Sequence, residues 1–443
     1  MFDGLFRKLN FSVDGVTVAK NISWAVIGKV VTLLGGFIVG VFVARYLGPE
    51  QYGLMSYVIS FVAIFQALAN FGLDNIEIRE EAKNRDERDA IIGTAFVLKL
   101  IFAVVTILLI AIIVNFSETD VFTRWMILLY SLSIICNSFF VARNYFTAIV
   151  WNEYVVKSEI SRTVIGIVIK VVLLLLHSNL VWFIAACMFD YVLLAAGYCL
   201  SYSKKIAPIR LWRFERKWAR FLVKQSFPLM LTSAAVIIYQ RIDQLMIKNM
   251  LDDASLGQFS VANRFVEVLV FVPVMICQTV APVLVSKRRE DEVAYKNMSQ
   301  FFMNIVVWIS IVISLITSLL SYFIVVWTFG EVYIPAVSVL QILAFKTVTV
   351  ALSNTAGQLL IIEGLQNYAV IRDILGCVVC VVLNYLLIPT LGVIGSAIVT
   401  ILSNFVAGYV SDIIIPKYRH LFRMQTKAIF LGWKSMLRFS KIR

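Results

Sequence analysis

The sequence predicts an all-α polytopic membrane protein with about twelve transmembrane helices. The first observation is its composition: 60% of the 443 residues are hydrophobic and only 15% are charged, whereas soluble domains have about 45–50% apolar and about 25% charged residues. The second is a recurrence of apolar runs of about 20 residues, the length that crosses a bilayer as a helix. The third is that the cations, which give a net charge of +13, gather between these runs.

Twelve apolar runs account for most of the chain. Each is expected to be helical, because lipid cannot satisfy unpaired backbone N–H and C=O groups. The fifth run is short, so we allow its helix to begin near Val155. The runs are 22–44, 54–73, 91–114, 125–150, 163–176, 181–200, 227–247, 259–285, 301–327, 336–362, 369–388 and 393–415.

The lysines and arginines predict how these helices are oriented. With the N-terminus inside, 30 of the 40 cations fall in cytoplasmic segments, which include the loop 77–90 and Arg372. Only Arg45, Arg124 and Lys248 fall in outside loops. Because cytoplasmic loops carry the excess of Lys and Arg, we predict that both termini are cytoplasmic. The basic amphipathic tail after residue 416 is expected to lie as a helix in the cytoplasmic interface.

An internal repeat relates two hairpin turns. A leucine, a glycine and a serine of the turn at 47–56 recur in register 204 residues later, in 251–260. Because six spans separate the copies, the two halves have the same orientation in the membrane, as in a parallel repeat. The prediction is therefore two six-helix lobes, residues 1–213 and 214–443, with the basic stretch 204–224 as their connector.

Motifs for chemistry are missing from the sequence. Cys377 and Cys380 form a C-x-x-C, but no second pair or nearby histidine completes a metal site, and helix packing explains them. No G-x-x-x-x-G-K-[ST] loop is present, so ATP hydrolysis is not expected to supply the energy. We expect no catalytic residue, metal site, cofactor or nucleic-acid partner, and we predict that the protein is not an enzyme.

Several stretches together resemble the polysaccharide-biosynthesis flippases, which translocate O-antigen and exopolysaccharide repeat units. The most specific is R-Y-L-G-P-E-x-Y-G at 45–53, and the similarity runs over nearly the whole chain. The other stretches are N-I-S-W at 21–24, N-F-G-L at 70–73, R-I-D-Q-L-M at 241–246, V-A-N-R-F at 261–265, N-Y-L-L-I-P at 384–389 and G-V-I-G-S-A at 392–397.

This resemblance implies a place in the superfamily of multidrug exporters, oligosaccharide flippases and lipid II flippases. It implies two lobes around a central cavity that opens alternately to each side of a bacterial or archaeal plasma (inner) membrane. The implied substrate is an undecaprenyl-pyrophosphate-linked oligosaccharide, which moves to the outer leaflet for cell-surface polysaccharide synthesis. The implied partners are membrane lipids and the polysaccharide polymerase machinery.

Two other functions compete with this interpretation. A sodium- or proton-coupled multidrug exporter of the same superfamily is the main alternative. A cavity for cationic drugs should be acidic, whereas the predicted spans contain more cations than acids. A scaffold that transports nothing is the third possibility, and the cost of burying charges in the membrane disfavours it.

Seven cations inside the predicted spans are the source of the candidate site. Each costs about 2.5–3.5 kcal/mol at the bilayer centre, so each must face water, pair with an acid or snorkel. Lys29, Lys99, Arg143 and Lys170 lie close enough to cytoplasmic ends to snorkel. Arginine matches phosphate oxygens with a planar fork of donors, and the resemblance favours Lys29, Arg241 and Arg264 and puts Arg45 at the outer mouth. The predicted substrate-binding residues are Lys29, Arg45, Arg143, Arg241, Arg264 and Lys346.

A charged quartet is predicted on the seventh and eighth runs. The hairpin between them turns near Asp253, and Asp243 and Arg264 are equally far from that turn. Arg241 and Glu267 also share a depth to within about one helical turn. Arg264 and Glu267 are i, i+3 neighbours on one helix. We expect the quartet to be either a neutral clamp or a switch that an ion or the substrate opens.

The energy source is left open between sodium, protons and the membrane potential. A lipid pyrophosphate with two negative charges gains about 4.6 kcal/mol per 100 mV on leaving an inside-negative cell. The resemblance places a sodium site on the seventh, eleventh and twelfth runs. Ile388 stands where a second acid would serve, which counts against an intact site. The nearest candidate ligands are Asp243, Asn384, Thr400 and Asn404.

Overall fold

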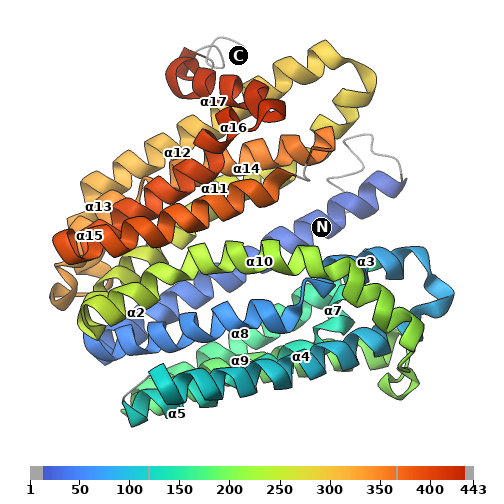
Figure 1. The fold of residues 1–443 in the computed structure, drawn as a ribbon, viewed down its shortest axis with the longest axis horizontal. Helices are drawn as coiled ribbons and strands as arrows, with labels where there is room; N and C mark the ends of the chain where they lie inside the picture. The colour runs from blue at the N-terminus through green and yellow to red at the C-terminus, as the bar shows by residue number, and fades with distance from the viewer. Residues whose placement is uncertain (1–12, 118–119, 366–367, 435–443) are drawn as a thin grey trace. The chain divides into compact units, whose positions relative to one another are not determined.

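The computed structural model describes residues 13–117, 120–365 and 368–434, and their side chains from Gly28 onward. Helices and turns, without a strand, make up this part of the chain (Figure 1). Nine of the described helical segments are long and apolar enough to cross a membrane. The predicted all-α polytopic membrane class is therefore confirmed.

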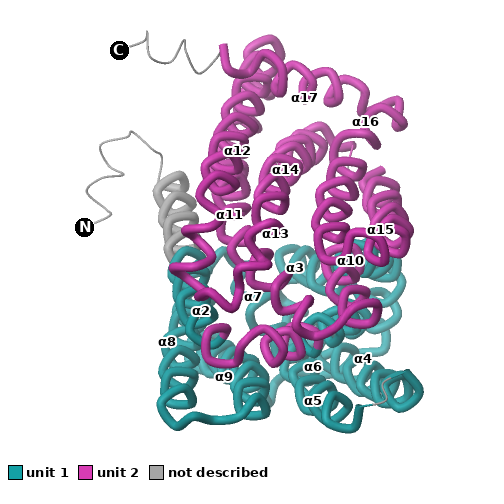
Figure 2. Tube along the Cα trace, turned by 90° about the vertical axis from the view of Figure 1, so that its left-hand side faces the viewer, with its two compact units in different colours: residues 1–43, 58–237 teal, residues 44–57, 238–443 magenta. Residues whose placement is uncertain are grey.

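The chain divides into two compact units (Figure 2). Unit 1 contains the described residues up to Val43 together with 58–237, and unit 2 contains 44–57 together with the described residues from Ile238 on. The predicted boundary between residues 213 and 214 separates the two repeats of the sequence, not the two compact units. It stays a prediction.

Unit 1 is built around a core in which α3, α4, α7 and α9 meet. Aromatic and branched side chains fill it, including Phe146, Tyr198 and Tyr202, which are almost wholly buried. Its elements are the unit 1 parts of α2 (Val13–Asn70) and α10 (Arg216–Met250), with α3 (Leu73–Lys83), η1 (Arg85–Glu87), α4 (Arg88–Ser117), α5 (Val121–Ser131), α6 (Ser133–Asn137), η2 (Ser138–Phe140), α7 (Val141–Ala148), α8 (Asn152–Leu175), α9 (Leu180–Lys205) and η3 (Ile209–Leu211).

Unit 2 has its own core, formed by α11, α12, α14 and the C-terminal helix α17. Met303, Val306 and Leu359 are buried at its centre. Besides its parts of α2 and α10, its elements are α11 (Asp253–Glu290), α12 (Glu292–Thr328), η4 (Glu331–Tyr333), α13 (Ala336–Leu343), α14 (Lys346–Glu363), α15 (Ala369–Phe405), the π-helix η6 (Val406–Val410), α16 (Ser411–Ile414), η7 (Pro416–Tyr418) and α17 (Arg419–Leu431).

Each predicted apolar run falls on a helical segment. The first two runs share α2, where Gly48 (φ 73°) separates them, and the last two begin in α15, where Gly392 (φ 60°) does the same. In α15, Arg372 Nε donates to the Ala407 carbonyl at 3.0 Å. These residues would lie about 50 Å apart in a continuous helix, so the chain folds back on itself. The fifth helix begins at Asn152, which confirms the earlier start allowed for it.

The loop predicted over 77–90 is mostly helical. The helix α3 covers Leu73–Lys83, and its acidic residues Glu77 and Glu81 are wholly buried in unit 1. The charge of this stretch suggested a solvated loop, but its acids are spaced three and four residues apart, so they share one face of a helix. Part of the predicted cytoplasmic loop is therefore a packed element.

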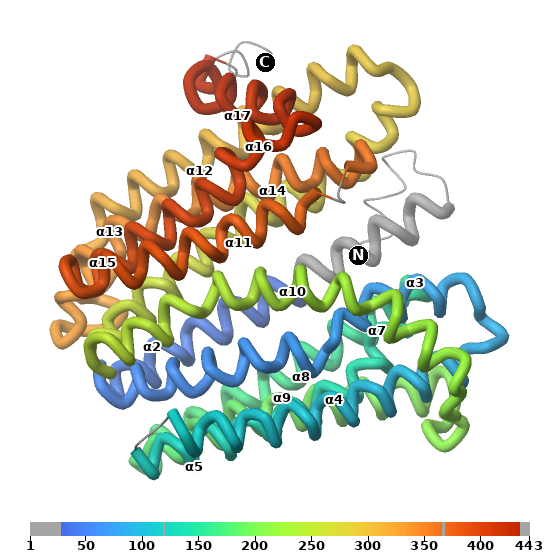
Figure 3. Tube along the Cα trace, viewed as in Figure 1, coloured from blue at the N-terminus to red at the C-terminus, as the bar shows by residue number. Residues whose placement is uncertain are grey.

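The tail is also a packed element. Helix α17 lies against α12 (Figure 3). Its residues Leu421, Gln425 and Ala428 are buried. Trp308 Nε1 donates to the Ala428 carbonyl at 2.9 Å. Phe430, Leu431 and Trp433 stay exposed, so an apolar edge remains for a membrane interface. Residues 435–443 of the predicted amphipathic tail lie outside the described residues.

Candidate functional site

A cluster of charged residues lies within unit 2 on α10, α11 and α14; we call it the cationic cluster. Glu267 is its shared acid: its carboxylate lies 3.8 Å from Arg241 Nη1 and 3.5 Å from Arg264 Nη1. Asn263 Nδ2 donates to the same carboxylate at 3.4 Å, and Lys346 Nζ donates to Asn263 Oδ1 at 3.0 Å. Three cations therefore gather around one carboxylate.

The side chains of the cationic cluster are partly exposed. The Arg241 and Arg264 side chains are 34% and 41% exposed, and that of Glu267 is 36% exposed. Both guanidinium–carboxylate distances exceed those of tight charge-assisted hydrogen bonds, which are about 2.7–2.9 Å. Glu267 therefore holds the two guanidinium groups less tightly than a close ion pair would.

The predicted quartet is confirmed in part. The pairing of Glu267 with Arg241 and with Arg264 follows the depth argument and the i, i+3 spacing. The predicted Asp243–Arg264 pair is wrong, because the Asp243 carboxylate faces Thr400 of α15. Equal distance from a hairpin turn sets depth in the membrane, but it does not set the direction in which a side chain leaves its helix.

Asp243 belongs to a second polar group, which joins α10 to the hairpin α15. It is buried, and its Oδ2 accepts from the Thr400 hydroxyl at 3.3 Å. Asn384 is also buried, and its side-chain oxygen has no hydrogen-bond donor among the described residues. Asn404 donates to the Thr400 carbonyl at 2.7 Å. The four residues of the predicted ion site thus lie on α10 and on both arms of α15.

The Asp243–Thr400 contact offers oxygen ligands to a cation. It supplies one carboxylate and one hydroxyl, which are hard ligands. No set of three or more His, Cys, Asp or Glu side chains in the described chain has the geometry to hold a metal ion. The positive charges that act on Asp243 are those of Lys346 and Arg241, so a cation there competes with two protein cations.

The other predicted substrate contacts lie on other elements of the chain. Arg45, in unit 2, donates to the backbone carbonyl of Trp327 near the end of α12. Lys29 is exposed on α2 in unit 1. Arg143 is half-buried on α7 in unit 1, beside Asn144. Their predicted role in substrate binding stays a prediction.

Two of the cations that lie close enough to a cytoplasmic end to snorkel are paired with acids, which was one of the alternatives for them. Lys99 is 2% exposed, and its Nζ lies 2.7 Å from Asp74 and 2.9 Å from Glu77. Lys170 Nζ lies 2.6 Å from Asp190. Pairing replaces snorkelling because an acid lies within reach on a neighbouring helix. The sequence contained these acids, but nothing in it linked α3 to α4 or α8 to α9.

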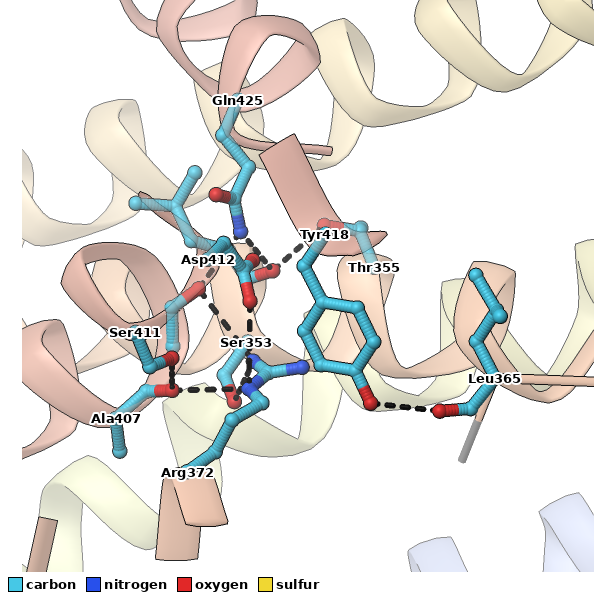
Figure 4. Close-up of polar contacts among 11 residues, drawn as sticks. Ser353, Thr355, Leu365, Arg372, Ala407, Ser411, Asp412, Tyr418 and Gln425 are labelled. Atoms are coloured by element: carbon cyan, nitrogen blue, oxygen red, sulfur yellow. Dashed lines mark hydrogen bonds and ion pairs between the residues drawn. The ribbon is translucent and has the colours of Figure 1, made fainter. Parts of the chain in front are cut away.

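Arg372, counted above among the cytoplasmic cations, is buried at the centre of a polar network (Figure 4). Besides its bond to Ala407, its guanidinium lies 3.6 Å from the wholly buried Asp412. Gln425 of α17 donates to the Gly408 carbonyl at 2.7 Å. The π-helix η6 leaves these carbonyls without regular α-helical partners, and Arg372 and Gln425 supply the donors.

The helices define a class of protein, an all-α polytopic membrane protein, and its fold is shared with solved transporters and flippases. The structure resembles the lipid II flippase MurJ in its inward closed conformation, with a TM-score of 0.70 and 15% identity over 94% of this chain and 93% of MurJ. It also resembles an inward-facing multidrug resistance MATE family transporter of the MOP superfamily, with a TM-score of 0.65 and 17% identity over 89% of this chain and 96% of the transporter.

The sequence then defines the family. The family model described as polysaccharide biosynthesis protein matches residues 18–287, and the chain belongs to this family. It is 25% identical over 264 residues to the succinoglycan biosynthesis transport protein ExoT of Rhizobium meliloti (strain 1021). That match covers 58% of this chain and 51% of ExoT, so the chain spans about half the length of this curated relative. These named relatives are transporters or flippases.

Proposed function

We propose that this protein flips an undecaprenyl-pyrophosphate-linked oligosaccharide from the cytoplasmic to the outer leaflet of a bacterial or archaeal plasma membrane. The observation that carries the proposal is the cationic cluster, in which Arg241, Arg264 and Lys346 gather near Glu267. Family membership and the named relatives support the link to polysaccharide synthesis. Both termini are proposed to be cytoplasmic.

The cluster has the chemistry that a pyrophosphate requires. Two guanidinium groups offer planar forks of donors, and Lys346 adds a point charge. Glu267 contacts both arginines while the anion is absent, and it helps to orient them. An arriving pyrophosphate competes with this carboxylate for the two guanidinium groups, which lets the anion bind and later leave.

The proposed movement is alternating access, and its energy comes from the membrane. An inside-negative potential favours outward movement of a charged lipid by about 2.3 kcal/mol per charge per 100 mV. We propose sodium as the coupling ion, with Asp243, Thr400 and Asn384 as its candidate ligands. A sodium ion there would compete with Lys346, whose positive charge acts on the Asp243 carboxylate.

Binding of the lipid head group tests the proposal. Purified protein in detergent is titrated with undecaprenyl pyrophosphate, undecaprenyl monophosphate and a lipophilic cationic drug, and thermal unfolding is recorded. We expect stabilisation in the order pyrophosphate, monophosphate, drug, and we expect Arg241→Ala and Arg264→Ala each to weaken pyrophosphate binding. The control is Arg423→Ala, an exposed arginine of α17. Preference for the cationic drug would instead support the multidrug exporter.

A further inference from the structure

Three acids of the short helix α3 point into the interior of unit 1. Asp74, Glu77 and Glu81 follow one another at intervals of three and four residues, so they lie along one face of the helix. Glu77 and Glu81 are wholly buried, whereas the Asp74 side chain is 41% exposed. The face packs against α4 and α7, which supply Lys99 and Asn144.

Lys99 occupies the place that a metal ion would need. Its ammonium lies 2.7 Å from Asp74 Oδ1 and 2.9 Å from Glu77 Oε2. Asn144 Nδ2 donates to the same two oxygens at 2.9 and 2.8 Å. These oxygens are therefore saturated by two nitrogen donors, and no room remains between them for a cation of another kind.

The remaining carboxyl oxygens have no such partner. Glu77 Oε1 and both oxygens of Glu81 are buried, and no hydrogen-bond donor of the described residues reaches them. Glu81 follows Glu77 by four residues, so the two carboxyl groups lie one helical turn apart on the same buried face of α3. Two adjacent ionised carboxylates without donors would carry a large desolvation penalty. One proton between them replaces this repulsion with an O–H···O hydrogen bond.

The charges around Glu77 and Glu81 balance if the two carboxyl groups share one proton. Besides Asp74 and Lys99, the charged group that faces these acids is Arg143 of α7, whose field reaches Asp74. With a single proton on the Glu77–Glu81 pair, two negative charges remain against the two positive charges of Lys99 and Arg143. Without the proton the buried cluster carries a net negative charge.

We infer that Glu77 and Glu81 form a proton-binding site in unit 1, in which one proton is shared by the two carboxyl groups. Its path to solvent starts at the exposed edge of Asp74. Phe71 and Gly72, both with positive φ (48° and 66°), separate α3 from the helix before it. Release of the proton leaves two adjacent carboxylates, so we expect it to accompany loosening of α3 from α4 and α7.

Glu80 provides a matched control on the same helix. It is also buried, but its carboxylate accepts from Arg79 Nε at 2.8 Å and from Asn84 Nδ2 at 3.2 Å. Hydrogen bonds from charged and amide donors stabilise the ionised form. Both carboxylate oxygens of Glu80 therefore have donors, in contrast to those of Glu81 beside it.

The test is infrared spectroscopy of the full-length protein in detergent near neutral pH, recorded in H₂O and D₂O. Difference spectra between wild type and each variant isolate the C=O stretching band of a protonated carboxyl group. We expect Glu81→Gln and Glu77→Gln each to remove one such band, and Glu80→Gln to remove none. Each glutamine resembles a protonated glutamate and can donate to the remaining carboxylate, so both variants should fold.

Loss of the same band from Glu80→Gln, or no loss from either pair variant, would overturn the proton site. Amide hydrogen exchange over residues 73–83 gives a second measurement. In wild type, protection should fall as pH rises by more than the intrinsic exchange rate explains, and Glu81→Gln should abolish this excess. Equal excess in wild type and Glu81→Gln would contradict the proposed link to α3. Neither measurement involves the flipped substrate, so the proton site can fail or hold independently of the proposed function.

Discussion

Gly53 and Gly257 contact each other's turn reciprocally within unit 2. A Cβ on Gly53 would overlap the carbonyl oxygen of Asp253, and a Cβ on Gly257 would overlap that of Pro49. Gly257 follows Gly53 by 204 residues, and Asp253 follows Pro49 by the same interval. The offset read from the sequence repeat therefore reappears as a symmetric contact, in which each glycine admits the backbone of the other copy.

Substituting either glycine should destabilise the protein. We expect Gly53→Ala and Gly257→Ala each to cost about 1–3 kcal/mol, since the added methyl meets a backbone carbonyl that cannot rotate away. Thermal unfolding in detergent measures the effect. The control is Gly357→Ala in α14, where a Cβ meets nothing within 4 Å, and this change should stabilise by up to about 1 kcal/mol. Unchanged unfolding temperatures for both turn variants would contradict the close approach.

Removing the acid of the cationic cluster should strengthen anion binding. Glu267→Gln frees Arg241 and Arg264 from their shared carboxylate, so affinity for undecaprenyl pyrophosphate should rise about tenfold, or about 1.4 kcal/mol. Flipping should slow, because the lipid leaves less readily. Binding by thermal shift and export in cells are the two measurements, with Glu267→Asp as the charge-preserving control. Weaker binding in Glu267→Gln would mean that the acid serves the substrate directly.

The Asp243–Thr400 contact predicts a sodium-dependent stability. In wild type, sodium chloride should raise the unfolding temperature more than potassium chloride at equal ionic strength, with a gain of about 1.4 kcal/mol at ten times Kd. Asp243→Asn should remove the difference, and Thr400→Val should reduce it. Thr390→Val, at an exposed hydroxyl of the same helix α15, should leave it unchanged. Equal effects of the two salts on wild type would exclude sodium from this group.

His420 should make the attachment of the C-terminal segment depend on pH. Its Nε2 lies 2.8 Å from Glu363, and this hydrogen bond raises the pKa of His420 above its ordinary value. The stabilisation is fully present below about pH 6.5, the unfolded pKa, and is lost as pH rises through the higher folded pKa. The side chain is 44% exposed, so we expect only about 0.2–1 kcal/mol.

Proteolysis or hydrogen exchange of α17 as a function of pH measures this effect. His420→Asn and Glu363→Gln should both make the protection of α17 independent of pH within about one unit on either side of pH 7. His177→Asn, in the turn after α8, should leave the profile as in wild type. If all three variants retain the wild-type profile, another group controls the segment.

The sequence predicted the helices well because one physical rule controls them. Lipid requires about twenty apolar residues with satisfied backbones, so each span appears as a run, and glycines such as Gly48 and Gly392 appear between runs. Depth along a hairpin is also readable, which is why the Arg241–Glu267 contact followed from counting residues to the turn. The family resemblance rested on similarly local features, such as the stretch at 45–53.

The contacts that the sequence did not reveal depend on the direction in which a side chain leaves its helix, not on its depth along the helix. Asp243 faces Thr400 instead of Arg264, and Lys99 meets Asp74 instead of snorkelling, since helix packing decides which side of each helix is covered. Arg372 illustrates the same limit: it was counted among the cytoplasmic cations, but the fold-back of α15 buries it. The acids of α3 were not recognised as buried residues, because a highly charged stretch is typical of a solvated loop.

Flipping of a defined lipid by the purified protein tests the central claim most directly. Proteoliposomes carry an undecaprenyl-pyrophosphate-linked oligosaccharide with a fluorescent sugar, and membrane-impermeant dithionite quenches only the outer leaflet. We predict that wild type exposes the protected inner pool, that the double variant Arg241→Ala with Arg264→Ala exposes it far more slowly, and that Arg423→Ala behaves as wild type. A protected fraction equal to that of protein-free liposomes for wild-type protein, with the lipid present and the protein folded, would contradict the account.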